Sequence, residues 1–262
     1  MSDPSQPSLA RRVLIALDAS SSSLAVLEEA ARLAVELRAE LQGVFVEDIN
    51  LLRLASLPFA REIPFSTAAP RQFDVAEMEQ SLKVRADRVR EALASRANRS
   101  RLEWSFQVVR GHVTRASLAA ASETDVLIIG CESRRHSPAF SFRRPRRQPL
   151  IVIFDGHSSA YRVLETSTQL ARPNRDQIVV LIATSNPEHA GNLRHQTDDW
   201  FVTRDIRAII DDTPVGDPET LVAAAGRWQA KLVLINRDSI LLSESTVESL
   251  VNDADCPVGI VP

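Results

Sequence analysis

The stretch from Val13 to Ala34 reads VLIALDASSSSLAVLEEAARLA and decides the fold. Its first six residues are an apolar run closed by an acid, which predicts a strand over Val13–Asp18. The serines that follow favour a helix N-terminus, and apolar residues then recur at helical spacing up to Leu37. A second apolar run, Leu41–Val46, comes directly afterwards. Two apolar strands joined by a helix are typical of a parallel sheet that is covered on both faces.

The same pattern returns later in the chain, at Ile151–Asp155 (IVIFD) and in a helix expected to run through about Ala171. A shift of 137 residues places Asp18 on Asp155 and matches eight of the 21 residues between Leu14 and Ala34. This internal repeat predicts an α/β protein with two tandem Rossmann-like open parallel sheets flanked by helices. We assign the two domains to residues 1–148 and 149–262.

The remaining elements follow from shorter signals of the same kind. In the first copy we expect a helix over 75–97, a strand over 102–109, a helix over 114–122 and a strand over 126–130. In the second copy we expect a strand over 178–184, a polar loop to about residue 204, a strand over 206–210, a helix over 218–228, a strand over 232–236, a helix over 245–251 and a final strand over 258–261. The first copy shows no counterpart of that final strand. Either it lacks a fifth strand, or the two sheets exchange one.

The first copy is the longer of the two because it carries an insert over residues 47–73, EDINLLRLASLPFAREIPFSTAAPRQF. The insert is too apolar for a plain linker and follows a parallel strand at the end where α/β proteins place ligands. It is either a helical flap that covers core or a dimer surface, or a ligand lid. We expect residues 51–60, with their four leucines and Phe59, to be helical or compactly folded. Burial of these side chains would shelter the region near Asp18 and Val46.

Composition excludes several classes of protein. The net charge of −3 argues against nucleic acid or an anionic membrane as a general partner. Two cysteines cannot form a disulfide framework, and no apolar run reaches the length of a membrane span. The N-terminus carries acid and proline where a signal peptide needs an apolar stretch. We therefore expect a soluble cytoplasmic protein.

The opening stretch, together with VVRGHVTRASLAAASETDVLIIG at 108–130, resembles the universal stress protein domain. The resemblance covers the first copy well and the second more loosely, and it implies the adenine-nucleotide alpha-hydrolase-like fold. In family members that bind ATP or AMP, the acid ending the first strand faces the nucleoside, and the second strand's backbone meets adenine. Asp18 and Asp155 match the acid, and Val46 matches the strand position. An acid there can also simply cap the following helix.

The candidate ligand site of the first copy consists of Asp18, Ala19, Val46, Gly111 and Gly130. The resemblance also implies a test for ATP, because the family's binders carry a loop of Gly, two residues, Gly, nine residues, Gly and Ser or Thr after the fourth strand. This chain has eight glycines, and no two of them are three residues apart. Without that loop, backbone N–H groups cannot approach phosphates in the family's manner. We expect no ATP binding through a glycine loop and no cofactor.

An arginine cluster lies between the two copies. Six arginines, with Phe140 and Phe142 among them, could bind anions by charge and stacking: Arg134, Arg135, Arg143, Arg144, Arg146 and Arg147. The alternative is a solvated linker that prolines hold extended.

No other chemistry emerges from the chain. The five histidines show no metal-ligand spacing, and no acid–base or nucleophile–base pair is recognisable, so we predict neither a metal site nor an enzyme. The leading interpretation is a non-catalytic stress-response protein that acts through dimerisation or partner docking. The alternative is a sensor of a nucleoside, AMP or an apolar molecule, held in the first copy's cleft. The copies are expected to pack as an intramolecular pseudo-dimer with the final strand at their contact, and a homodimer is a further alternative.

Overall fold

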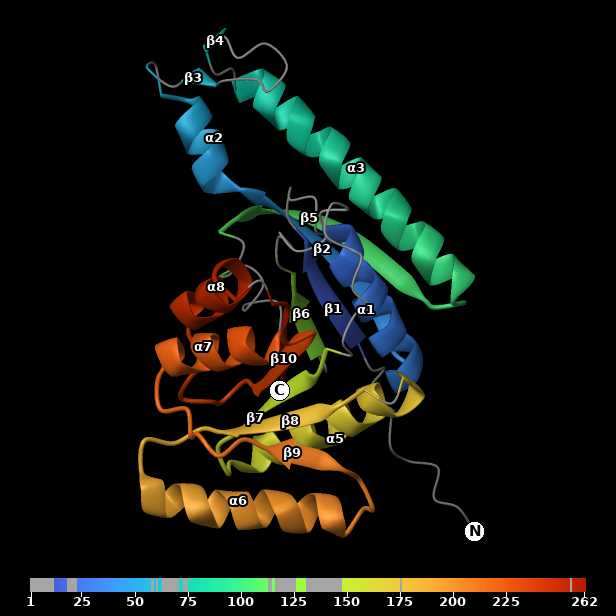
Figure 1. Cartoon of the computed structure of the whole chain (residues 1–262). Coiled ribbons are helices and arrows are strands. Elements are labelled where there is room, and N and C mark those ends of the chain that lie inside the picture. Colours follow the sequence, from blue (N-terminus) through green and yellow to red (C-terminus); the bar gives the residue numbers. More distant parts are fainter. Residues whose placement is uncertain are drawn as a thin grey trace, which may run out of the picture.

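The apolar runs of the sequence become the strands of one mostly parallel sheet in the computed structural model (Figure 1). The structure describes residues 12–17, 23–57, 59, 61–62, 71–72, 75–112, 115, 126–130, 148–174, 176–254 and 256–262. The strands are β1 (Arg12–Leu17), β2 (Glu40–Asp48), β3 (Arg61–Glu62), β4 (Arg71–Gln72), β5 (Trp104–Gly111), β6 (Val126–Ile129), β7 (Leu150–Phe154), β8 (Ile178–Ile182), β9 (Ala208–Ile210), β10 (Leu232–Asn236) and β11 (Val258–Val261). The helices are α1 (Ser23–Leu37), α2 (Ile49–Ala55), α3 (Val75–Arg99), α5 (Ser158–Asn174), α6 (Pro187–Val202), α7 (Pro218–Trp228) and α8 (Glu244–Asn252).

The strands run in the order β5-β2-β1-β6-β11-β10-β7-β8-β9. We call β5-β2-β1-β6 with their helices the first half, and β11-β10-β7-β8-β9 with theirs the second half. Within each half we number the strands of the large sheet in chain order. From its outer edge inward, each half then has the order third, second, first, fourth: β5-β2-β1-β6 and β9-β8-β7-β10. The α/β class and the open, helix-flanked parallel sheet are confirmed. The strands form one continuous sheet, however, where the sequence predicts two.

The final strand β11 causes this continuity. It pairs parallel to β10 and antiparallel to β6, with Val258 opposite Ile129 and Ile260 opposite Leu127. The prediction that residues 258–261 lie at the contact between the halves is confirmed. Among the described residues the first half has four strands of the large sheet, and the fifth strand of the second half closes its β6 edge. A strand paired on both sides leaves no open edge at this junction.

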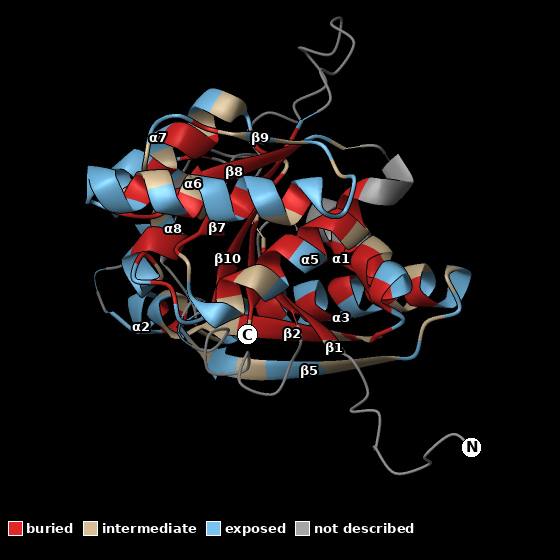
Figure 2. Cartoon of the chain, turned by 90° about the horizontal axis from the view of Figure 1, so that it is seen from below, coloured by how far each residue is buried: buried red, intermediate tan, exposed pale blue. Residues whose placement is uncertain are grey.

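Helices cover both faces of the sheet. Helices α1, α3, α5 and α6 pack on one face, whose core includes Phe45, Leu93 and Phe154. Helices α7 and α8 pack on the other face, against residues such as Ile153 and Ile235. Figure 2 shows buried residues along the strands and on the inward sides of the helices. All five residues of β7 are fully buried, as expected for a strand covered on both faces.

Helix α6 corrects the sequence analysis, which predicted a polar loop up to about residue 204. Asn186 caps the helix by accepting from the backbone N–H of Glu188, and Pro187 occupies the first turn. The buried stripe contains only Ala190, Leu193, Thr197 and Phe201. The hydroxyl of Thr197 donates to the Leu193 carbonyl at 2.8 Å, so a polar residue fills a core position. The spacing of apolar residues in this segment is therefore too irregular to predict a helix. The predicted helix over 114–122 lies outside the described residues except for Arg115.

The insert and the start of the helix after it form what we call the arm: α2, the hairpin strands β3 and β4, and residues 75–81 of α3. Figure 1 shows it projecting from the body at the end of β2. The expected helix is present over Ile49–Ala55, and Leu52 and Ala55 are buried. Leu54, Leu57 and Phe59 are 50%, 38% and 76% exposed, so their own chain does not cover these three side chains. The alternative that a second chain covers them stays a prediction.

Candidate functional site

Parallel α/β sheets place ligands at the carboxyl ends of the strands, where neighbouring strands lead to helices on opposite faces. In the first half this point lies between β1 and β6, and in the second half it lies between β7 and β10. Asp155 and Asn236 stand there in the second half. In the first half, Gly130 directly follows β6 and is partly buried. Asp18 and Ala19, which follow β1, lie outside the described residues.

In the second half, the two strand ends are joined by side chains. The Asn236 amide donates to Ser159 Oγ at 3.1 Å and to Asp155 Oδ1 at 3.4 Å. The same Asp155 oxygen accepts the backbone N–H of His157 at 3.1 Å, directly before α5. Asn236 is 0% exposed. The acid therefore holds the turn that leads into α5, and the Asn236 side chain fills the space beside it.

Gly156 makes the turn between β7 and α5 possible. Its φ of +81° lies in the left-handed region, which L side chains rarely adopt. A Cβ at this position would also lie 2.5 Å from a methyl carbon of Leu193. This tight turn holds Asp155 against Asn236 and keeps the carboxyl edge of the second half compact.

Among the described residues, two buried oxygens of this pair have no hydrogen-bond partner, Asp155 Oδ2 and Asn236 Oδ1. The Asp155 side chain is only 3% exposed. The pair has the character of a packed internal contact.

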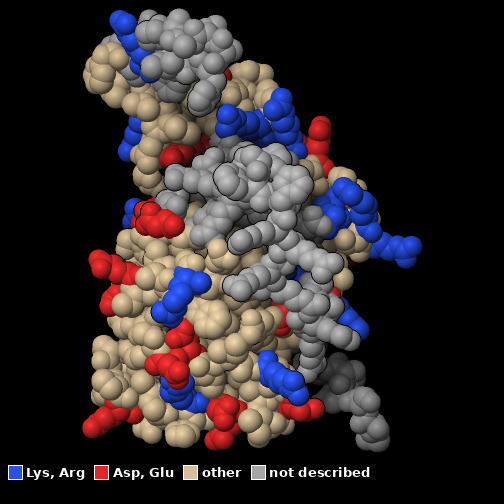
Figure 3. All heavy atoms as spheres, in the orientation of Figure 1, with Lys and Arg blue, Asp and Glu red and all other residues tan. Residues whose placement is uncertain are grey.

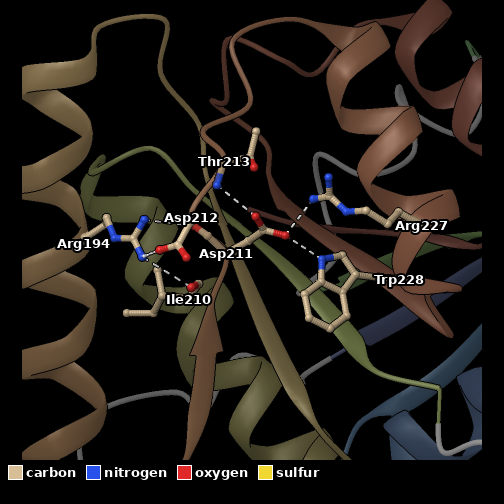
Figure 4. A network of polar contacts seen from close by, with 7 residues as sticks. All are labelled: Arg194, Ile210, Asp211, Asp212, Thr213, Arg227 and Trp228. Atoms are coloured by element: carbon tan, nitrogen blue, oxygen red, sulfur yellow. Dashed lines mark hydrogen bonds and ion pairs between the residues drawn. The ribbon is translucent and has the colours of Figure 1, made fainter.

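A second polar network follows β9 and is centred on Asp211 (Figure 4). Its carboxylate accepts the Thr213 backbone N–H at 2.9 Å, the Trp228 indole N–H at 2.6 Å and an Arg227 N–H at 2.7 Å. Partial burial alone raises the pKa of Asp211, but these hydrogen bonds and the Arg227 charge outweigh it, so the pKa is lowered. The network joins the end of β9 to the last turn of α7.

Arg194 extends this network to α6. Its guanidinium donates to the Asp212 carboxylate, and to the Asp211 and Ile210 carbonyls at 3.3 and 3.5 Å. No local pattern indicates this cluster, because Arg194 of α6, Arg227 of α7 and Asp211 after β9 come together only in the folded chain.

In the first half, the predicted site residues lie on different strands. Val46 is buried in β2 and stands opposite Val109 of β5. Gly111 ends β5, opposite Asp48, at the outer edge of the sheet. Strands β2 and β1 therefore separate Gly111 from Gly130. The six arginines of the predicted anion site, residues 134–147, lie outside the described residues.

The base of the arm carries a polar cluster that the sequence analysis missed. Arg110 of β5 donates to Glu47 of β2 at 3.1 Å and to Glu79 of α3 at 3.2 Å. The hydrogen bond and charge of Glu47 raise the pKa of Arg110, so its charge is secure at every physiological pH. His112 and Asn50 meet at 3.2 Å beside it. The arm thus stands over the carboxyl ends of β2 and β5.

Within the part of the chain that the structure describes, no group of three or more His, Cys, Asp or Glu side chains is placed to hold a metal ion. In the same residues, no helix is long and apolar enough to cross a membrane.

Sequence comparison identifies the family to which this fold and these sites belong. A family model described as "Universal stress protein family" matches residues 10–142. The chain belongs to the universal stress protein family. A search of curated proteins finds no match.

Solved structures of universal stress proteins resemble this one in fold. One from Archaeoglobus fulgidus is 12% identical, covers 95% of this chain and 97% of its own, and has a TM-score of 0.53. One from Pseudomonas aeruginosa is 11% identical, covers 96% and 93%, and has a TM-score of 0.47. One from Burkholderia pseudomallei is 21% identical, covers 44% and 96%, and has a TM-score of 0.32. The first likeness extends over both halves of the sheet.

In the universal stress protein family, the loop after the fourth strand is where ATP binders carry their glycines. The second half has Asn236-Arg237-Asp238 in this place. The Arg237 backbone N–H donates to the Val261 carbonyl at 2.8 Å, and the Ser239 N–H donates to the Asn236 carbonyl at 3.2 Å. A phosphate cradle requires free backbone N–H groups that point at the ligand. These two are already bonded within the protein.

Proposed function

We propose that this chain is a non-catalytic universal stress protein that acts by docking proteins and does not bind ATP through the family's glycine loop. For the second half, the proposal rests on the backbone N–H of Arg237. This N–H donates to the Val261 carbonyl of β11 and is therefore not available to a phosphate. For the first half, the glycine spacing supports it: Gly130 has no glycine three residues after it.

The proposal that the chain is not an enzyme is supported by contacts in the second half. Asp155 and Asp211 are the acids placed at strand ends there, and both are held by donors from the protein. An acid that serves as general base must be within reach of a substrate proton. The unpaired Oδ2 of Asp155 is buried, out of reach of a substrate proton, and both oxygens of Asp211 accept hydrogen bonds.

A small-ligand sensor in the first half is the second candidate. The contacts of Arg110 with Glu47 and Glu79 favour it, because they hold the arm over the strand ends near Val46. Its ligand would be a nucleoside, AMP or an apolar molecule, held without phosphate contacts from a glycine loop.

Calorimetric titration of the whole chain with ATP–Mg²⁺, AMP and adenosine tests both candidates. We expect no heat of ATP binding at up to millimolar nucleotide. Micromolar ATP affinity with a clear preference over adenosine would overturn the proposal. Equal binding of adenosine and AMP would instead support the sensor. The variants Asp18→Asn and Asp155→Asn form a matched pair, because they alter corresponding positions: loss of binding in the first alone locates the ligand in the first half.

We also propose that the two halves are domains, 1–148 and 149–262, fused as an intramolecular pseudo-dimer. The common strand order and the antiparallel β6–β11 contact support this division. Residues 149–262 contain all five strands of their half, so this fragment should fold when expressed alone. Circular dichroism showing an unfolded fragment would contradict the division.

A further inference from the structure

The later part of α3 and the turn after it form a strongly basic segment. Residues 81–101 contain seven lysines and arginines but only two acids, so the segment has a net charge of +5. Six of the seven basic side chains are exposed, and Arg96 is partly buried. The second half, residues 149–262, has nine lysines and arginines against 16 acids. Positive charge is therefore concentrated on one helix of the first half, while the second half is acidic.

Four of the basic residues lie on one side of α3, which we call the arginine flank: Arg85, Arg88, Arg96 and Arg99. They form two pairs of helical neighbours, and the second pair follows the first after about three turns, roughly 16 Å along the axis. The buried stripe of α3, from Leu82 to Ala97, uses other positions of the helix. Figure 3 shows Lys and Arg side chains along α3. The flank thus presents a repeating set of guanidinium groups outside the core.

The helix dipole explains only part of this arrangement. Arg96 and Arg99 lie in the last turn, where cations are stabilised by the partial negative charge of the helix end. The effect falls off within one turn, so it does not account for Arg85 and Arg88. Like charges that are neighbours on a helix repel each other. A bound anion would relieve this repulsion.

The surroundings of the flank indicate which kind of anion fits. Asp87 and Glu91 are exposed beside it, one turn apart. A nucleic-acid backbone or an anionic membrane is negative throughout and would meet these two carboxylates. Within residues 75–99, all of which the structure describes, Val84 is the only exposed large apolar side chain, at 39%. The helix therefore lacks the apolar face that enters a bilayer and the aromatic rings on which bases stack. A protein, in contrast, can offer carboxylates to the flank and neutral groups to the two acids.

We propose that the arginine flank of α3 docks an acidic helix of a partner protein. A second helix has the same rise and repeat as α3, so its carboxylates can stand opposite both arginine pairs. Guanidinium groups bind carboxylates by charge-assisted, often bidentate hydrogen bonds. Such complementary charges determine specificity and the rate of association. The inference rests on the proposed function, because it names the chemistry of the protein that the chain docks.

Fluorescence anisotropy of the whole chain with a labelled acidic peptide tests this contact. The probe is a helical peptide of about 20 residues made of Glu and Ala, in which the glutamates have the spacing of the four arginines. We expect saturable binding that weakens at least tenfold when NaCl is raised from about 50 to 500 mM. No binding at the lower salt concentration overturns the inference.

Charge reversal locates the contact on α3. Arg85→Glu combined with Arg88→Glu should weaken peptide binding at least tenfold. Arg162→Glu combined with Arg207→Glu, at two exposed arginines of the second half, is the matched control with the same change of net charge. It should change the affinity less than about twofold at 150 mM NaCl, where distant charges are screened. Equal losses in both double variants would overturn the inference, because net charge alone would then explain binding.

Two further comparisons keep a folding defect from being mistaken for a lost contact. A peptide with Lys in place of each Glu should bind the Arg85→Glu, Arg88→Glu variant more tightly than the wild type, and the absence of this gain would contradict a contact at the flank. If circular dichroism shows that the reversed variant has lost helix, Arg85→Gln combined with Arg88→Gln replaces it. The expected loss of affinity is then at least threefold.

Other polyanions provide the last comparison. We expect a DNA duplex of about 20 base pairs, and vesicles that contain phosphatidylglycerol, to bind more weakly than the acidic peptide at 150 mM NaCl, because Asp87 and Glu91 repel them. Tighter binding of either one, lost on reversal of Arg85 and Arg88, would assign the flank to phosphate groups and overturn the inference. None of these outcomes affects the ATP titration, so this inference and the proposed function fail separately.

Discussion

The two halves of the sheet share a strand order but end in opposite ways. After β2, the first half continues into the arm, which exposes leucines and a phenylalanine. After β8, the second half passes directly into α6, and its strand ends are closed by Asp155, Asn236 and Asp211 with their partners. One half thus closes its strand ends with internal hydrogen bonds, while the other exposes apolar side chains beyond its strand ends. The second half acts as the scaffold, and the first half presents the arm.

The largest expected effect comes from breaking the strand that joins the halves. Ile260 of β11 is 1% exposed and pairs with both β10 and β6. Ile260→Asp buries an unpaired carboxylate at this junction and should cost about 4 kcal/mol or more of unfolding free energy, measured by urea denaturation. Ile209→Asp, on the edge strand β9, is the control and should cost about 1 kcal/mol or less. A similar loss in both variants would show that the junction is not special.

The next effect tests the closed edge of the second half. Asn236→Ala removes the buried donor of Asp155 and should cost about 1–3 kcal/mol, because the carboxylate stays buried with one partner fewer. Asn50→Ala is the comparison variant in the first half, where the amide contacts His112 at the surface. It should cost less than about 0.5 kcal/mol. Equal effects in thermal melting would remove the contrast between the halves.

Local signals made most elements predictable. The apolar run 13–18 lies within one residue of β1, and the helix expected over 218–228 has the bounds of α7, because capping residues and apolar spacing lie within the segment itself. The sequence predicts β11 at the contact between the halves, but it does not show that β6 is the strand it pairs with there, since no local pattern encodes which edge an apolar strand joins. Helix α6 was missed because Thr197 replaces an apolar residue in its stripe.

The sites were less predictable than the fold. The match between Asp18 and Asp155 placed an acid at the end of the second half's first strand, and Asp155 does stand directly after β7. Its contact with Asn236, 81 residues away, depends on strand pairing that no local pattern encodes. The Asp211 and Arg110 networks are equally non-local. Leu54, Leu57 and Phe59 stay exposed on their own chain because the insert projects from the end of β2 (Figure 1), and no local pattern encodes that direction.

A pH-dependent effect of comparable size is expected at Asp211, whose carboxylate accepts hydrogen bonds from Arg227 and Trp228. Since folding lowers the Asp211 pKa, its contribution is present above the unfolded pKa of about 3.9 and is lost as pH falls through the folded value. Asp211→Asn should therefore cost about 1.5–3 kcal/mol at pH 7. The difference from wild type should shrink below about pH 4. Melting curves between pH 7 and 3 that stay parallel would contradict this.

The smallest effect concerns the base of the arm. Arg110 lies at the surface, where salt screens its contacts with Glu47 and Glu79 and ion pairs contribute little to global stability. Arg110→Gln should leave the melting temperature nearly unchanged but speed amide hydrogen exchange in α2 at low salt, because one tie between β5 and α3 is weakened. In 1 M NaCl the variant and the wild type should exchange alike. Arg204→Gln, which removes a cation lying 4.2 Å from the Trp200 ring on α6, is the matched control and should not alter exchange in α2. Faster exchange in α2 that persists at high salt would mean that Arg110 supports the arm by packing and not by charge. The contrast between the arm and the closed strand ends of the second half would then be lost.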